Sequence, residues 1–178
     1  MTKLKEYKMY INGVWVDAEN KKTFESLNPE NNEPWAIVPE ASTKDVNNAV
    51  EAGATFGVSP GATDNLISAC EEAGLPLLAG ASSASEAMVL LEKGYSVQKF
   101  FPAEAAGGAK FLKSLSSPLP NITFCPTGGV SQENAKNYLD SPNVECVGGS
   151  WVAPKDVITN KDWQYIEKLA KDAVRELS

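Results

Sequence analysis

Five short apolar segments, each ending in a cluster of glycine, proline or serine, recur in this chain with helix-like segments between them. They are Thr55–Ser59, Leu75–Ala79, Val97–Phe101, Ile122–Pro126 and Val144–Val147. Strands joined through a helix run parallel, because the helix returns the chain to the end of the sheet from which the strand started. The pattern therefore predicts an α/β fold with about five parallel βα units.

Capping residues and glycines mark the helices between these strands. Ser83-Ala84-Ser85-Glu86 is a capping box, and Gly94 follows the helix that it opens. Further helices are expected over 63–74, 108–115 and 132–139, and from about residue 162. Two architectures fit this pattern. One is an open five-stranded parallel sheet with helices on both faces, and the other is a (β/α)₈ barrel without its first three units.

The first 40 residues or so have a different texture, with short strands and no helix-length connection. Strands are expected at Met9–Val16, at Thr23–Leu27 before Asn28-Pro29, and at Trp35–Val38. Connections this short favour antiparallel pairing. The first helix signal is the capping pattern Ser42-Thr43-Lys44-Asp45. We therefore expect a small antiparallel β segment with a helix over residues 1–52, and the parallel units over 53–178.

Composition excludes several classes of function. The chain has no histidine, which removes Ser-His-Asp, Cys-His and His-metal chemistry. A net charge of −7 without a basic cluster argues against nucleic acid or an anionic membrane as a partner. The three cysteines have no CxxC spacing, so neither zinc nor a disulfide scaffold is supported, and a reducing cytoplasm is the expected compartment. The N-terminus has no apolar core of signal-peptide length.

The segment Val97–Phe101 places a lysine in an apolar strand. Alternation puts Val97, Lys99 and Phe101 on one face, so we expect Lys99 to be substantially buried. Burial disfavours the ammonium and lowers a lysine pKa. A neutral amine in an apolar pocket is what a Schiff-base nucleophile requires. The alternative interpretation is an edge-strand lysine that extends its amine to water.

Two consecutive strands end in glycine pairs, in Cys125-Pro126-Thr127-Gly128-Gly129-Val130-Ser131 and in Val147-Gly148-Gly149-Ser150-Trp151. Glycines let the backbone approach a ligand closely, and a following helix N-terminus favours an anion. Such a pair is typical of the phosphate site after the last two strands of a TIM barrel. Otherwise the first loop is a turn with Ser131 as the helix N-cap. Glu104, after Val97–Phe101, is either an acid or base or a helix-capping carboxylate.

From about Glu51 onward these residues resemble 2-keto-3-deoxy-6-phosphogluconate (KDPG) aldolase, also known as 4-hydroxy-2-oxoglutarate aldolase. The matching segments are FGVSPG (56–61), LPLLAGAS (75–82), KFFPAEAAGG (99–108), FCPTGGVS (124–131) and NVECVGGSWVAP (143–154). The resemblance implies a TIM-type barrel, usually trimeric, and a class I aldolase. Such an enzyme is a lyase that forms a Schiff base with pyruvate. It cleaves a 2-keto-3-deoxy sugar acid phosphate to pyruvate and an aldehyde.

The resemblance also assigns roles to individual residues. Lys99 is the Schiff-base lysine, and Phe101 packs beside it. Ser59 and Pro60 line the pocket. The carboxylate or phosphate oxygens are held by Thr127, Gly128, Gly129 and Ser150. The family uses no cofactor and no metal. The implied partners are a small keto acid or phosphate substrate and further copies of the chain.

The family's catalytic glutamate, with an arginine and a threonine of its active site, belongs to the first three βα units, which have no counterpart among these segments. Glu104 or water would have to move the proton instead. Loss of a general base typically lowers rates by about 10²–10⁴-fold, so we expect weak or no turnover. A phosphate-binding or oligomerising module without catalysis is the alternative.

Residues 1 to about 52 resemble a different family. MYINGVWVDAENKKTFESLNPENNEPWAIVPEASTKDVNNAVEA is similar to the N-terminus of an aldehyde dehydrogenase. That family's nucleotide-binding loops and catalytic cysteine have no counterpart here, so dehydrogenase activity is not implied. The two resemblances meet near Ala49–Gly53, as in a fusion. A dehydrogenase fragment that docks onto a partner is the third hypothesis.

Overall fold

The computed structural model describes residues 4–27 and 33–177. The chain divides into two compact units. The first unit holds residues 1–57 and 63–77, and the second holds 58–62 and 78–178. No helix in the described ranges is long and apolar enough to cross a membrane.

The strands of the first unit are short. They are β1 (Lys5–Glu6), β2 (Met9–Ile11), β3 (Val14–Val16), β4 (Thr23–Leu27) and β5 (Pro34–Pro39). They form a sheet in the order β1-β5-β4 and a separate hairpin of β2 and β3. The segment Met9–Val16, expected as one strand, is therefore two strands. Asn12 (φ 49°) and Gly13 (φ 79°) make the turn between them, as the left-handed residues of a tight hairpin do.

Antiparallel pairing is confirmed for β4 with β5 and for β2 with β3. It is wrong for β1, which pairs parallel with β5. The reason is that three strands lie between β1 and β5 in the sequence, so the chain has the length to return to the same end of the sheet. The expected strand end at Asn28-Pro29 lies outside the described residues.

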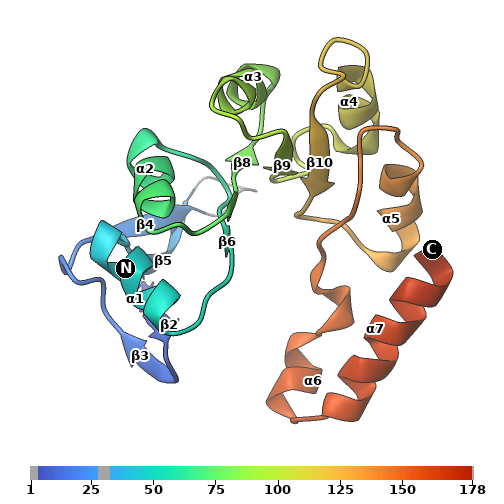
Figure 1. Ribbon diagram of the computed structural model, residues 1–178. Coiled ribbons are helices and arrows are strands. Elements are labelled where there is room, and N and C mark those ends of the chain that lie inside the picture. The colour runs from blue at the N-terminus through green and yellow to red at the C-terminus, as the bar shows by residue number, and fades with distance from the viewer. Residues whose placement is uncertain (1–3, 28–32, 178) are drawn as a thin grey trace. The chain divides into compact units, whose positions relative to one another are not determined.

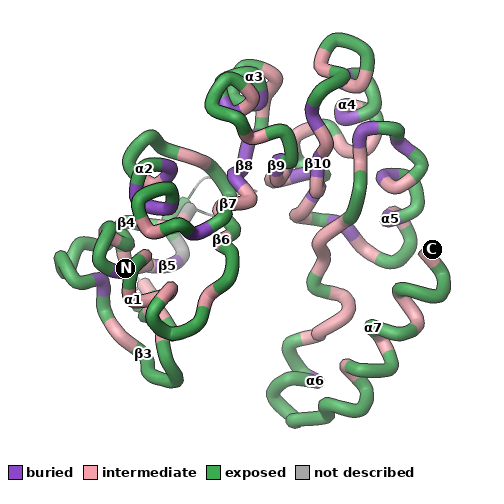
Figure 2. Tube along the Cα trace, in the orientation of Figure 1, coloured by how far each residue is buried: buried purple, intermediate pink, exposed green. Residues whose placement is uncertain are grey.

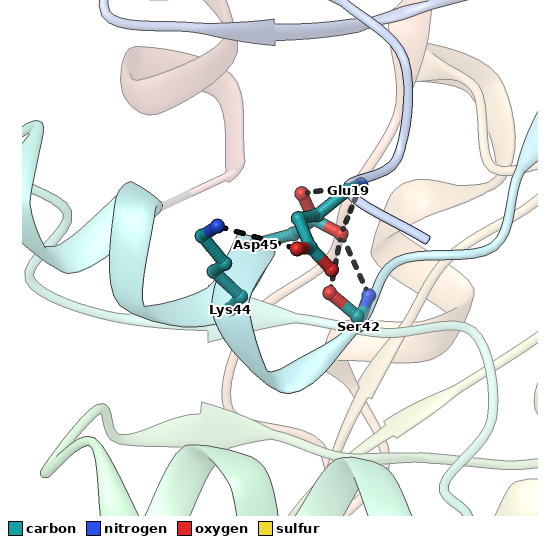
Figure 3. Close-up of polar contacts among 4 residues, drawn as sticks. All are labelled: Glu19, Ser42, Lys44 and Asp45. Carbon is teal, nitrogen blue, oxygen red and sulfur yellow. Dashed lines mark hydrogen bonds and ion pairs between the residues drawn. The ribbon is translucent and has the colours of Figure 1, made fainter. Parts of the chain in front are cut away.

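Helices α1 (Thr43–Glu51) and α2 (Asp64–Glu72) complete the first unit. Asp45, only 4% exposed, anchors the start of α1 (Figure 3). Its carboxylate accepts hydrogen bonds from the Ser42 backbone N–H (2.8 Å) and hydroxyl (2.9 Å), which confirms the capping pattern. It also accepts one from the Glu19 N–H (3.2 Å). At the surface, Lys44 Nζ lies 3.2 Å from a Glu19 carboxylate oxygen.

The second unit is built on a parallel sheet in the order β10-β9-β8 (Figure 1). Its strands are β8 (Gly80–Ala81), β9 (Val97–Phe100) and β10 (Thr123–Pro126). Two further strands, β6 (Gly57–Val58) and β7 (Leu77–Leu78), pair with each other where the chain passes between the units. The α/β class and the parallel pairing are thus confirmed. The five expected strands, however, do not form one continuous sheet.

The expected last strand, Val144–Val147, is reduced to two parallel bridges with the β10 segment, at Phe124–Val144 and Thr127–Gly148. The partners of Phe124 and Thr127 are offset differently along the chain, so the register slips between the two bridges. A slip of this kind interrupts the regular ladder of hydrogen bonds. Alternation of apolar residues alone does not reveal it.

The helices of the second unit follow the sequence pattern closely. They are α3 (Ala84–Glu92), α4 (Gly108–Leu115), α5 (Gln132–Leu139), the 3₁₀ turn η1 (Ser150–Val152), α6 (Lys155–Thr159) and α7 (Trp163–Leu177). The bounds of α4 and α5 are those expected. The short α6 and η1 were not expected, because segments of three to five residues are too short for a helical period to show.

The core of the second unit lies on one face of β9 and β10, where alternate residues are buried (Figure 2). Fully buried side chains on this face are Gln98, Phe100, Phe124 and Pro126. The Phe100 ring lies 5.9 Å from that of Phe124 and 5.6 Å from that of Phe111 in α4, measured between centroids. The opposite face, which carries Val97 and Lys99, is open, since Val97 is 52% exposed.

Candidate active site

Lys99 stands in the middle strand of the parallel sheet. Its register partners are Gly80 in β8 and Cys125 in β10. Its Nζ lies 5.1 Å from the centre of the Phe101 ring, so the two side chains lie beside each other as expected. The expected burial is present in part, because Lys99 is half-buried rather than fully enclosed. The open face of the sheet that exposes Val97 accounts for the difference.

Ser59 and Pro60 pack against Gly80, the partner of Lys99. A Cβ placed on Gly80 would lie 2.2 Å from the Pro60 carbonyl carbon and 2.5 Å from the Ser59 oxygen. These are backbone atoms, so only glycine permits the approach. Gly80 therefore brings the Ser59-Pro60 strand end toward the strand of Lys99. Sequence reasoning missed this role, although Gly80 lies in a quoted segment.

The loop after β10 packs on the loop after β9. Gly128 has a φ of +98°, and a Cβ there would lie 3.0 Å from a carbon of the Phe101 ring. The backbone N–H of Glu104 donates to Gly128 O (3.1 Å), and that of Ala103 donates to Thr127 O (2.8 Å). The first glycine pair thus lies beside the aromatic ring that contacts Lys99.

Glu104 is held by a tyrosine from α5. Its carboxylate accepts a hydrogen bond from the hydroxyl of Tyr138, a fully buried residue. Burial first, then this hydrogen bond and the nearby charge, raise the pKa of Tyr138, so the hydroxyl keeps its proton. Glu104 does not cap α4, whose N-cap is Gly107. Sequence reasoning missed Tyr138, because its only signal is a polar group on an otherwise apolar helix face.

The second glycine pair lies next to the first. Gly148 bridges Thr127, and a Cβ on Gly148 would lie 3.0 Å from Thr127 Oγ1. Gly149 lies against the Trp151 ring, and the exposed Ser150 begins η1. The consecutive loops expected from the sequence therefore meet through Thr127 and Gly148. In the described part of the chain, no hydrogen bond joins Ser150 to Lys99.

Ser131 is the N-cap of α5, as the alternative interpretation held. Its backbone N–H donates to the Asn134 side-chain oxygen (2.8 Å), which completes a capping box. Helix α5 thus begins directly after the first glycine pair, and its free backbone N–H groups lie at that end. In the described residues, no group of three or more potential metal-ligating side chains is found.

The arrangement brings most of the predicted residues to one edge of the sheet. An amine lies beside an aromatic ring, two backbone loops rich in glycine follow, and a helix begins at the first of them. Active sites of parallel α/β folds lie at this carboxyl edge of the strands. An amine there can condense with a carbonyl group, and backbone N–H groups there can bind an anion.

Comparison with known proteins places most of the second unit, and part of the first, in one family. The model of the KDPG and KHG aldolase family matches residues 36–169. The match begins ahead of Glu51, where the resemblance noted in the sequence begins, so it includes α1 and most of β5. The dehydrogenase resemblance of residues 1–52 is not supported by these matches.

Individual homologous proteins give the same result. The 2-dehydro-3-deoxy-phosphogluconate aldolase of Pseudoalteromonas atlantica is 46% identical over 144 residues, which are 79% of this chain and 67% of that protein. That of Pseudomonas aeruginosa is 48% identical over 130 residues, which are 73% of this chain and 59% of that protein. The chain therefore spans about three fifths to two thirds of the length of these relatives.

A solved structure agrees with the sequence comparison. KDPG aldolase from Legionella pneumophila, with pyruvate captured as a covalent carbinolamine intermediate, superposes with a TM-score of 0.68 and 45% identity. The superposition covers 72% of this chain and 62% of that one. KDPG aldolase from Zymomonas mobilis gives a TM-score of 0.66 at 40% identity. The chain belongs to the KDPG and KHG aldolase family.

Proposed function

We propose that this chain carries the Schiff-base half of KDPG aldolase chemistry, with Lys99 as the nucleophile. The observation that supports it most directly is the Lys99 amine, 5.1 Å from the Phe101 ring centre, in a strand paired with β10, which leads into the first glycine-rich loop. The amine attacks the keto carbon of pyruvate to give a carbinolamine. Loss of water then leaves an imine, and loss of a methyl proton gives the nucleophilic enamine.

The proposed reaction of the whole site is cleavage of a 2-keto-3-deoxy sugar acid phosphate to pyruvate and an aldehyde. In it, Thr127, Gly128, Gly129 and Ser150 hold the carboxylate or phosphate oxygens, and Ser59 and Pro60 line the pocket. Glu104 or water moves the proton. Because the Tyr138 hydroxyl already occupies one Glu104 carboxylate oxygen, we expect turnover to be weak.

The partial barrel and its assembly are part of the same proposal. We propose that the strands present here are consecutive units of a TIM-type barrel, and that the open face beside Val97 is covered in a homo-oligomer, a trimer by resemblance. Light scattering of the purified chain tests the assembly. The proposed compartment is the cytoplasm, in keeping with three cysteines that lack a disulfide framework.

The origin of residues 1–52 in an aldehyde dehydrogenase also remains a proposal, supported by the segment of sequence quoted above. A pulldown that depends on residues 1–40 would favour a docking role for it.

A phosphate-binding role without catalysis predicts binding of a sugar phosphate without any pyruvate adduct.

Trapping with borohydride tests the central proposal. Pyruvate and borohydride should leave a stable adduct on Lys99, which blocks tryptic cleavage there and yields one peptide over residues 94–110. The variant Lys99→Arg keeps the charge and should form no adduct, while Lys110→Arg in α4 should behave as the parent chain does. A folded parent chain without an adduct on Lys99 would overturn the proposal.

A further inference from the structure

Cys125 and Cys146 lie beside each other in the second unit, on two segments that run parallel. Cys125 belongs to β10, and Cys146 belongs to the segment that bridges it. The two segments are paired on both sides of the cysteines, by the bridges Phe124–Val144 and Thr127–Gly148. Backbone hydrogen bonds support this pairing. They run from Glu145 N to Phe124 O (3.2 Å) and from Gly148 N to Pro126 O (2.9 Å). The two cysteines therefore occupy neighbouring positions across this pairing.

The two thiols are close enough to affect each other's ionisation. Desolvation of the Cys146 sulfur first, and its interaction with Cys125 second, raise the pKa of Cys146 to about 11. Cys125 is half-buried and Cys146 is exposed, so small reagents reach the pair. The third cysteine, Cys70, is buried in α2 of the first unit.

The spacing suits a covalent bond between the sulfurs. Neighbouring strands lie about 4.8 Å apart, within the range of about 4.4–6.8 Å between Cα atoms that disulfides span. We propose that Cys125 and Cys146 are a redox-active dithiol that closes to a disulfide in the presence of a small-molecule disulfide such as oxidised glutathione.

The exchange balances without any other reactant. One cysteine thiolate attacks the oxidant, forms a mixed disulfide and releases one glutathione thiol. The second cysteine thiolate then attacks the protein sulfur of that mixed disulfide and releases the second glutathione thiol. The protein loses two protons and two electrons, which together are two hydrogen atoms, and the oxidant gains them as two thiols.

The location of the pair gives the bond a consequence, which rests on the proposed function. Cys125 is the register partner of Lys99, so the disulfide forms beside the nucleophilic amine. It also ties β10 to the segment that leads into Gly148 and the second glycine-rich loop. We expect oxidation to diminish trapping of pyruvate on Lys99, and dithiothreitol to restore it.

Mass spectrometry of the full chain tests the dithiol without reference to activity. After treatment with oxidised glutathione, the intact mass should fall by two hydrogen atoms, and tryptic peptides 114–136 and 137–155 should be joined. Cys125→Ser and Cys146→Ser should each leave the other cysteine carrying glutathione, and Cys70→Ala should leave the internal bond intact. Stable glutathione adducts on the parent chain, without an internal bond, would overturn the proposal.

Borohydride trapping of the reduced and oxidised parent chain then separates the two proposals. Less adduct in the oxidised chain supports the effect on Lys99, and equal adduct in both refutes it. Adduct in neither form refutes the proposed function, while the masses of the same samples still decide whether the disulfide forms.

Discussion

The hydroxyl of Tyr138 donates a hydrogen bond to the carboxylate of Glu104 and thereby connects α5 to the loop after β9. Glu104 in turn packs under Gly129, since a Cβ on that glycine would lie 2.7 Å from Glu104 Cβ. Gly129 O accepts a hydrogen bond from the Asn134 side chain of α5 (3.1 Å), so α5 contacts both Glu104 and Gly129. One partly buried polar contact therefore helps to hold the loops after β9 and β10.

Tyr138→Phe removes only the hydroxyl and should destabilise the chain. A hydrogen bond to a charged group contributes about 1.5–3 kcal/mol, and Glu104 loses this partner in the variant. The pKa of Tyr138 is raised, so this stabilisation is fully present below the unfolded tyrosine pKa of about 10 and is lost as the pH rises through the raised value. Urea unfolding of both chains at neutral pH measures the difference.

Tyr165→Phe is the matched control, since it makes the same chemical change at a position in α7 that is 44% exposed. Its free energy of unfolding should change by less than about 0.5 kcal/mol. Equal effects of the two variants would show that the contact with Glu104 contributes nothing to stability.

Gly129→Ala should lower the free energy of unfolding by more than the strain of its backbone conformation alone explains. Gly129 and Gly94 both have positive φ, of 77° and 93°, so alanine is strained at either position. Only at Gly129 does the added Cβ meet side-chain carbons, those of Glu104 at 2.7 Å, whereas at Gly94 no described atom lies within 4 Å. Overpacking adds about 1–3 kcal/mol, so Gly129→Ala should be the less stable variant by that amount. Thermal and urea unfolding of Gly129→Ala and Gly94→Ala measure this difference in stability.

The local elements of the second unit could be predicted because their signals are local. Gly107 is the N-cap of α4, Ser131 is the N-cap of α5, and both helices have the expected bounds. Alternation along Val97–Phe101 also predicted that Lys99 and Phe101 share a side, and the Lys99 amine does lie over the Phe101 ring, although Phe101 follows β9. The exposure of that face could not be predicted, because burial depends on what the rest of the chain packs against it.

The missed parts of the site all involve partners distant in sequence. Tyr138 and Glu104 are 34 positions apart, and nothing near either residue indicates the other. Gly80 meets Ser59 and Pro60 only because strands fold together, and the register slip opposite β10 is likewise a tertiary effect. The resemblance supplied residue roles that periodicity could not. It did not indicate how far the Lys99 side chain is exposed to solvent.

Asp45→Ala should destabilise the first unit. The change leaves the backbone N–H groups of Ser42 and Glu19 without the carboxylate that accepts their hydrogen bonds (Figure 3). Losing a nearly buried capping carboxylate of this kind costs about 2–3 kcal/mol. Unfolding monitored by circular dichroism should show the loss.

Lys44→Ala provides the comparison on the same helix turn. The ion pair of Lys44 with Glu19 is at the surface, with the two side chains 64% and 46% exposed. Exposed pairs contribute about 0–1 kcal/mol and are screened by salt. A Lys44→Ala effect as large as that of Asp45→Ala would refute this ranking of the two contacts.

Glu86→Gln should weaken the chain at neutral pH but not in acid. The Glu86 carboxylate accepts hydrogen bonds from the Ser82 N–H and hydroxyl (both 2.8 Å) and from the Ser83 hydroxyl (2.9 Å), at the start of α3. The backbone hydrogen bond from Ser82 is the main cause that lowers the pKa of Glu86. The stabilisation is therefore present above the unfolded glutamate pKa of about 4.3 and is lost as the pH falls through the lowered value.

Because Glu86 is largely exposed, solvent screening limits this effect to about 0.5–1 kcal/mol. Glu92→Gln removes the same charge at the opposite end of α3, where a negative charge opposes the helix dipole, and it should not destabilise. Urea unfolding at neutral pH should separate the two variants, and their curves should converge near pH 2, below both glutamate pKa values. A gap between them that persists in acid would mean that Glu86 acts through packing rather than through its charge.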